Sequence, residues 1–360
     1  MGSVNIDNTG SGADVTLSSD GTDLLLDGTA IGGGGGSPDL LAENYDGTST
    51  KPTATGTNAV AIGELSTASP DRGMAFGYSA TASGTQSTAV GRGASAGGTL
   101  ASAFGYAATT AASQAVAIGQ SYSAGQDSLA AVIDSNSSSY GATGSNSVAM
   151  GRQAKATQLH SYAFGSSASA TNTGSVVLGG TTCTSSGLYS TTIGGAYNAA
   201  NGDYSVASGR YGNTNSIYGK RSHGTQLDLR LGEFSLGIST TDATASVLTT
   251  NGSSASTNNQ VVLQNNSAYA FHGTIVARQQ ASGGTASAAW KIEGLIRREG
   301  SASTTVLVNS ATTVLDNTPS WGMALSADTT NGGLAITVTG AASTNIRWVA
   351  TIHTSEVTYA

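Results

Sequence analysis

The sequence predicts an all-β protein in which a stacked β-roll is followed by a C-terminal β-sandwich. Three observations carry this prediction. A tripeptide of alanine, an apolar residue and glycine returns at near-constant spacing between about residues 58 and 224. Strand-like segments without that repeat fill residues 242–360. Only 10% of the 360 residues are charged whereas 50 are glycine, a composition typical of a repetitive β protein rather than an enzyme.

The repeat has a period of fourteen residues that later lengthens to fifteen. Its closing glycines are Gly63, Gly77, Gly91, Gly105 and Gly119, then Gly151, Gly165 and Gly179, and finally Gly194, Gly209 and Gly224. Fourteen residues suit one coil of two short strands and two tight turns, and so short a repeat buries a face only by stacking on its neighbours. We therefore expect a parallel β-roll of 14–15-residue coils over residues 57–224.

The strand before each glycine alternates between large and small side chains. Val60 and Ile62 share one face, while alanines occupy the other. We expect the large side chains, including Ile118 and Phe164, to point into the coil, and the glycine to take a corner with positive φ. Because a coil this thin has a small core, several copies should pack about a common axis.

These repeats resemble the head of trimeric autotransporter adhesins and the same module in tailed-phage fibres. The segment GSNSVAMG at residues 144–151 is the clearest match, and the resemblance covers roughly half of the chain. It implies a left-handed parallel β-roll built by three chains. One coil departs from the pattern, because the run from Leu129 to Asp134 lacks its glycine. We interpret Asp134 to Tyr140 as a loop that bulges from this coil.

Residues 1–56 form a separate acidic segment. They hold eight acidic residues against Lys51 alone, which matches the net charge of −7 of the whole chain. Two short apolar runs separated by turn residues predict a small hairpin, and the five glycines at 32–36 predict a flexible joint. We interpret this segment as an attachment arm that docks on tail or baseplate proteins; a solvated acidic arm is the alternative.

Residues 225–241 are expected to form a neck between roll and tip. His223 falls at the column otherwise held by Phe or Ile. With three-fold symmetry, three copies could meet near the axis and bind a metal or an anion, and a hydrogen-bonded structural histidine is the favoured alternative. We also expect an ion pair between Arg221 and either Asp228 or Glu233 of a neighbouring chain.

Residues 242–360 contain seven to eight strand-like segments separated by Gly, Asn and Ser turns, a pattern typical of a β-sandwich. Trp290 and Trp348 lie on apolar strand faces and are expected in the core. The Asn-Gly-Gly turn at 331–333 predicts a tight hairpin. Trp321 follows a Thr-Pro-Ser turn, so a core position and an exposed sugar platform are both open. This segment resembles the C-terminal domain of phage tail fibres, on its YAF, AAWKIEG and IRWVA motifs.

Together these features predict a homotrimeric phage tail fibre or tail-tip protein, part of the virion tail, with a structural and adhesive role. The tip is expected to bind a host surface glycan or protein, with Trp321, Arg297 and Arg298 as the candidate receptor-binding residues. The alternatives are a bacterial trimeric surface adhesin and, less favoured, a β-solenoid polysaccharide depolymerase. Genes for tail proteins or for a secretion apparatus nearby would separate the first two.

Several classes of activity are not expected. A depolymerase needs paired carboxylates, yet the five acidic residues between 58 and 216 are scattered, and no catalytic or cofactor motif is present. A pI near 4.9 without a basic stripe argues against nucleic acid. No apolar run is long enough to span a membrane, and no secretion signal is seen, which counts against a bacterial adhesin. The lone Cys183 excludes an internal disulfide framework.

Overall fold

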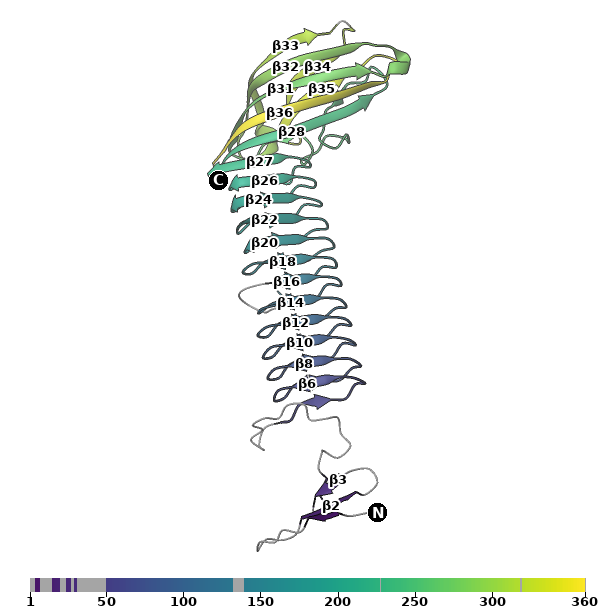
Figure 1. Cartoon of the computed structure of the whole chain (residues 1–360). Coiled ribbons are helices and arrows are strands. Elements are labelled where there is room, and N and C mark those ends of the chain that lie inside the picture. Colours follow the sequence, from purple (N-terminus) through teal and green to yellow (C-terminus); the bar gives the residue numbers. More distant parts are fainter. Residues whose placement is uncertain are drawn as a thin grey trace.

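In the computed structural model, a long β-solenoid leads into a C-terminal β-sandwich (Figure 1). The structure describes residues 50–131, 139–226, 228–317 and 319–359, together with four short strands nearer the N-terminus. These strands, β1 (Val4–Ile6), β2 (Val15–Ser19), β3 (Leu24–Leu26) and β4 (Thr29–Ala30), pair in that order as an antiparallel sheet. The pairing of β2 with β3 confirms the predicted hairpin. The glycine run expected to be a joint lies outside the described residues.

The solenoid consists of two parallel sheets that face each other. The first contains the strand before each glycine: β6 (Val60–Ile62), β8 (Met74–Phe76), β10 (Thr88–Val90), β12 (Ser102–Phe104), β14 (Val116–Ile118), β16 (Leu129–Ala131), β18 (Val148–Met150), β20 (Tyr162–Ser166), β22 (Val176–Thr181), β24 (Thr191–Ala196), β26 (Val206–Arg210) and β27 (Arg221–Gln226).

The second sheet contains the shorter strands: β5 (Thr53–Ala54), β7 (Thr67–Ala68), β9 (Thr81–Ala82), β11 (Ser95–Ala96), β13 (Thr109–Thr110), β15 (Tyr122–Ser123), β17 (Gly141–Ala142), β19 (Lys155–Ala156), β21 (Ser169–Ala170), β23 (Thr184–Ser185) and β25 (Ala199–Ala200). Neighbouring coils pair in register, so the predicted roll is confirmed. The loop predicted at 134–140 falls mostly on residues 132–138, which lie outside the described part.

The interior of each coil is made of small residues, and the expected inward position of the large ones is wrong. Ala75, Ala103 and Ala117 are 0% exposed, whereas Ile118 is 48% exposed. Phe164, the other side chain expected inside, is half-buried. Two tight turns hold the facing strands so close that the space between them is filled mostly by alanine and serine, with a few branched side chains such as Val177 and Thr192.

Buried serines close one turn of several coils. The hydroxyl of Ser147 donates to the carbonyl of Gly144 at 2.6 Å, and Ser190 makes the same bond to Gly187 at 2.7 Å. Because the serine is small and its hydroxyl is satisfied within the turn, it can be buried without an unpaired polar atom. This bond explains why serine precedes so many of the repeat strands.

The closing glycines occupy corners that other residues rarely adopt. Gly77 has a φ of +129°, and a Cβ at this position would lie 2.7 Å from the carbonyl oxygen of Gly91 in the next coil. The predicted glycine corner is therefore confirmed. A further residue of many coils also has positive φ without being glycine, for example Gln86 and Leu100, both at 59°. These residues lie in the left-handed region at the turns.

Two sheets enclose the core of the C-terminal domain and confirm the predicted sandwich. The larger sheet runs in the order β28 (Leu229–Thr240), β36 (Ile346–Thr358), β31 (Ser267–Gln279), β32 (Ser287–Arg298) and β33 (Val306–Asp316). The smaller contains β29 (Ser246–Val247), β35 (Gly333–Thr339), β30 (Val261–Val262) and β34 (Gly322–Asp328). The hairpin between β34 and β35 contains the predicted Asn-Gly-Gly turn.

Helical structure among the described residues is confined to two short 3₁₀ turns, η1 (Ala281–Gly283) and η2 (Ala302–Thr304). No helix in these parts of the chain is long and apolar enough to cross a membrane.

The predicted neck at 225–241 is replaced by a direct continuation of the sheet. After β27, the chain reverses, and β28 pairs antiparallel with both β27 and β36. Residues 229–240 are therefore the first strand of the C-terminal domain. Apolar residues alternate along this strand, and Phe234 and Leu236 are buried against the opposite sheet. The segment therefore belongs to the sandwich and is not a separate linker.

A buried ion pair ties the last coil to the final strand. Nζ of Lys220 lies 2.8 Å from the carboxylate of Glu356, and both side chains are 0% exposed. The rings of Phe234 and Tyr269 lie 5.2 and 5.9 Å from this ammonium, and Thr354 donates to Glu356 at 2.8 Å. Burial lowers the pKa of Lys220 while Glu356 opposes that shift. The buried ammonium of Lys220 is therefore stabilised in its charged form by Glu356.

We predict that Gly77→Ala destabilises each chain by about 1–3 kcal/mol, since the new Cβ meets both an unfavourable φ and the next coil. Gly93→Ala is the matched control. Gly93 has a φ of +68°, its Cβ would meet nothing closer than 4.0 Å, and Ala107 already occupies a similar corner at 50°. Chemical denaturation of both variants tests this difference, and equal losses would contradict the close-approach argument.

We predict that Lys220→Met costs about 3–5 kcal/mol, because it leaves the Glu356 carboxylate buried without its partner. The double variant Lys220→Met with Glu356→Leu should regain most of that loss. Lys291→Met serves as the control, since Lys291 and Glu293 form an exposed pair at 3.7 Å and its removal should change little. Urea unfolding of the four proteins measures these effects; a double variant no more stable than Lys220→Met would overturn the pairing argument.

Candidate functional site

The solenoid carries a row of exposed apolar side chains along its first sheet, here called the apolar stripe. Its members are each between 40% and 49% exposed, and they are Phe104, Ile118, Met150, Leu178 and Ile193. Because the coils stack in register, the stripe follows the long axis of the solenoid. A continuous exposed apolar surface of this kind marks a contact with another protein surface.

Toward the C-terminal domain the stripe becomes polar. Ile193 pairs with Ser208, which pairs with His223, and His223 in turn lies opposite Leu231 of β28. Nδ1 of His223 lies 3.1 Å from the hydroxyl of Ser208. This contact fits the structural role considered for His223. The described residues contain no group of three or more His, Cys, Asp or Glu side chains that could hold a metal.

The other charged residues at this junction have neighbours within the chain. Arg221 lies opposite Glu233 across the β27–β28 pair. Asp228 forms an ion pair with Arg230 at 3.2 Å. Arg221, which was expected to pair with a carboxylate of another chain, therefore has Glu233 of its own chain as an alternative partner.

The three candidate receptor-binding residues lie in different surroundings. Trp321 is 5% exposed and packs 5.7 Å from the ring of Trp348, so its use as an exposed sugar platform is ruled out in this structure. The side-chain amide of Asn317 accepts from the backbone N–H of Trp321 and donates to the carbonyl of Trp321. The side chain of Arg297 is 55% exposed and lies 3.8 Å from Glu299. Arg298 points the other way and lines a pocket.

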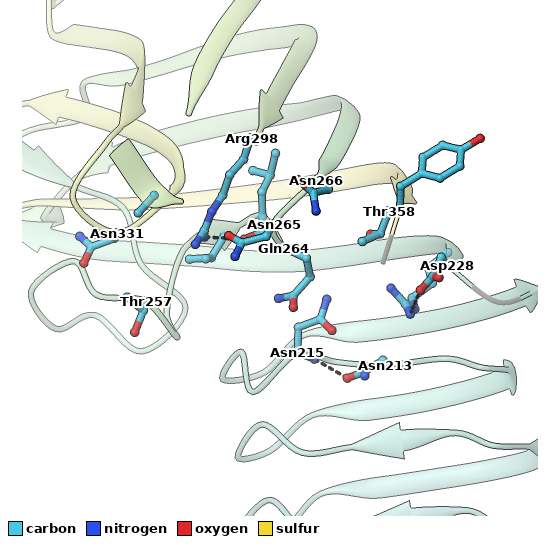
Figure 2. A pocket seen from close by; sticks show the side chains of 15 residues that line it. Asn213, Asn215, Asp228, Thr257, Gln264, Asn265, Asn266, Arg298, Asn331 and Thr358 are labelled. Atoms are coloured by element: carbon cyan, nitrogen blue, oxygen red, sulfur yellow. Dashed lines mark hydrogen bonds and ion pairs between the residues drawn. The ribbon is translucent and has the colours of Figure 1, made fainter. Parts of the chain in front are cut away.

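This pocket, here called the junction pocket, lies between the last coil and the C-terminal domain and has a volume of about 580 Å³ (Figure 2). About half of its lining residues carry amide or hydroxyl side chains. They are Asn213, Asn215, Thr257, Gln264, Asn265, Asn266, Asn331 and Thr358. Val262, Leu263 and Ala302 contribute apolar surface, and Tyr359 lies at the rim with 79% of its surface exposed.

Backbone contacts fix the shape of the junction pocket. Nη1 of Arg298 donates to the carbonyl of Leu263 at 2.7 Å. Asn331 is held by Asp328, whose carboxylate accepts from both the backbone and the side chain of Asn331 at 2.9 and 2.8 Å. Burial acts to raise the pKa of Asp328, but these hydrogen bonds outweigh it and the pKa is lowered. The carboxylate therefore remains charged and holds Asn331 in place.

Several polar atoms of the junction pocket lack partners. Nδ2 of Asn215, Nε of Arg298 and Oγ1 of Thr358 are buried and make no hydrogen bond to any described residue. Within the same described part of the chain, the side-chain amides of Gln264 and Asn265 also have no hydrogen-bond partner. Figure 2 shows Gln264 directed toward Asn215 across the hollow. The pocket thus presents unused donors and acceptors from two walls.

The junction pocket could not be predicted from the sequence because its walls come from distant segments. The last coil, the start of β28, the loop before β31, the end of β32 and the end of β36 all contribute. Each segment alone looks like an ordinary turn rich in asparagine, such as Asn265-Asn266. The one available signal is the high number of asparagines in these turns. That the turns lie close together becomes clear only when the pairing of β28 with β36 is known.

Comparison with known families identifies the repeats. Residues 54–78, 71–94, 96–121, 142–161 and 157–182 match the YadA head domain repeat. No curated protein sequence matches the chain. The matched segments lie in the solenoid, where the apolar stripe is exposed. The solenoid is thus built of YadA-head-like repeats, and such repeats imply that three copies of the chain assemble into an adhesin-like fibre.

Proposed function

We propose that this chain is a homotrimeric tail fibre of a tailed phage, which attaches the virion to a bacterial surface through residues 242–360. The exposed apolar stripe is the main observation in support of assembly into a trimeric fibre. The resemblance of the YAF, AAWKIEG and IRWVA segments to the C-terminal domains of phage tail fibres supports the origin in a phage.

Burial of the apolar stripe favours the association of three chains. In a single chain its five side chains remain roughly half exposed, because the coil interior is filled mostly by alanine and serine. Burying them against neighbouring copies removes apolar surface from water, a gain on the order of 1 kcal/mol for each side chain. With one stripe on each of three chains, this gain is repeated around the fibre axis.

The proposed roles of the segments follow the chain. Residues 1–56 dock on tail or baseplate proteins, the solenoid acts as a rigid spacer, and the C-terminal domain contacts the host. We propose a binding role rather than catalysis. Solenoid carboxylates such as Asp71 and Asp203 accept backbone N–H groups of the preceding coil, from Thr57 at 3.0 Å and Leu188 at 2.8 Å. These contacts favour a structural use of the acidic residues.

A bacterial trimeric surface adhesin is the second candidate function. The match to the YadA head domain repeat favours it, since this repeat takes its name from the head of an adhesin. The stripe, the solenoid and the exposed C-terminal domain serve a cell-bound adhesin as well as a virion. The two functions differ in where the fibre is anchored, and not in the surfaces described above.

We predict that the purified chain is a trimer and that Ile118→Asp disrupts it, because three carboxylates would then be buried at one level of the interface. Ser95→Asp is the control, since Ser95 lies in the other solenoid sheet, away from the stripe. Native mass spectrometry at micromolar concentration measures the assembly. A wild-type monomer would refute the trimer, and an unchanged Ile118→Asp trimer would refute the stripe as its interface.

We predict that antibodies against residues 242–360 label the tails of phage particles released from the source culture. Immunogold electron microscopy of the particles and of the cells separates the two candidate functions. Label on phage tails, together with reduced phage adsorption in the presence of the purified trimer, is the expected result. Label confined to the surface of intact cells would instead assign the fibre to a bacterial adhesin.

A further inference from the structure

We propose that the junction pocket is a saccharide-binding site, present once in each chain, that recognises a sugar unit of a surface glycan through its hydroxyl groups. This inference rests on the proposed attachment function and names the ligand and the site. It moves recognition from Trp321, which is buried, to the boundary between the solenoid and the C-terminal domain.

The chemistry of the pocket wall matches a ligand that both donates and accepts hydrogen bonds. Each Asn or Gln side chain carries two donor hydrogens and an acceptor oxygen, as hydroxyl-rich ligands require. The side-chain amides of Gln264 and Asn265 have no partner among the described residues and can make such bonds. The buried Nε of Arg298 and Oγ1 of Thr358 are likewise unpartnered there, and unmade hydrogen bonds at buried atoms are costly until a ligand satisfies them.

The charge of the pocket argues against a polyanionic ligand. Arg230 is neutralised by Asp228 at 3.2 Å and also donates to the carbonyl of Tyr211 at 3.0 Å. Arg298 therefore remains as the one excess charge among the described lining residues. One guanidinium suits a pair of neighbouring sugar hydroxyls or a single carboxylate of an acidic sugar, whereas a nucleic acid needs several cations.

The shape of the site also suits a sugar. Its volume of about 580 Å³ lies within the ~300–1,000 Å³ usual for ligand pockets. The exposed ring of Tyr359 at the rim offers an apolar face against which the C–H groups of a sugar can pack. A peptide would instead call for an apolar hole to anchor a side chain, and Val262, Leu263 and Ala302 provide little more than a patch of wall.

The junction pocket lies on the opposite side of β28 from the apolar stripe. On β28, Leu229 and Leu231 lie on the exposed face that continues the apolar stripe, whereas Arg230 between them points to the opposite face and lines the pocket. Chains that meet along the stripe therefore do not cover the pocket. Three copies on one fibre can engage a repetitive glycan together, which strengthens attachment beyond the affinity of one site.

The test measures binding of the full-length trimer to an array of bacterial surface oligosaccharides that includes neutral and acidic sugars. We expect wild type to bind, and Asn265→Ala and Tyr359→Ala each to weaken binding by about tenfold through the loss of one ligand contact. Asn309→Ala, on exposed strand β33 and outside the pocket, is the matched control for Asn265→Ala. Thermal melting should be unchanged in all three variants.

A second pair of variants compares adjacent arginines. Arg298→Ala should lose binding, whereas Arg297→Ala, outside the pocket, should bind like wild type. Binding to acidic sugars alone would identify a carboxylate as the partner of Arg298. Failure of wild type to bind any saccharide, or binding that the pocket variants do not change, would overturn the inference.

Adhesion to bacterial cells distinguishes this inference from the proposed function. Mild periodate, which cleaves sugar diols, should abolish adhesion of wild type, and protease treatment of the cells should not. Adhesion that survives periodate but is lost after protease would overturn the saccharide site and leave host attachment standing. If the trimer binds saccharides on the array but neither adheres to cells nor is found on phage tails, the saccharide site stands and the proposed attachment function is contradicted.

Discussion

The narrow gap between the two sheets of each coil is the constraint on which the rest of the structure depends. Turns of a few residues set this gap, and it is filled mostly by alanine and serine, with a few larger side chains such as Val177 and Thr192. The large apolar residues of every repeat are consequently displaced to the outside. A solenoid with this interior leaves its large apolar residues about half exposed in a single chain, as a surface that other copies can cover.

The same sheet continues from the solenoid into the C-terminal domain without a break. β27 is the last parallel strand, and β28 pairs with it in the opposite direction before β36, β31 and β32 follow. The switch from short to twelve-residue strands lets a second sheet cover the inner face, where Trp290 and Trp348 stack at 5.8 Å. Lys220 and Glu356 then fix the first strand of this transition to the last strand of the chain.

The sequence allowed the architecture to be predicted wherever a regular period set the register. The fourteen-residue repeat and the alternation along β31, β32 and β36 are local patterns, and the structure has strands at these places. Alternation shows that Val60 and Ile62 share a face but not whether that face is inside, which depends on the gap between sheets. The turn before Trp321 likewise gave no sign that Trp348 lies beneath it, and the junction pocket requires contacts between segments far apart in sequence.

Because the coils stack in register, the length of the solenoid can change only by whole coils. Each coil touches only the coil before and the coil after it, and the pairs along both sheets are interchangeable. Gain or loss of one fourteen-residue unit by recombination between repeats would shift the tip by about one strand spacing, ~4.8 Å, without altering either end. The length of the solenoid can therefore change, through the number of repeats in the gene, without a change in the C-terminal domain.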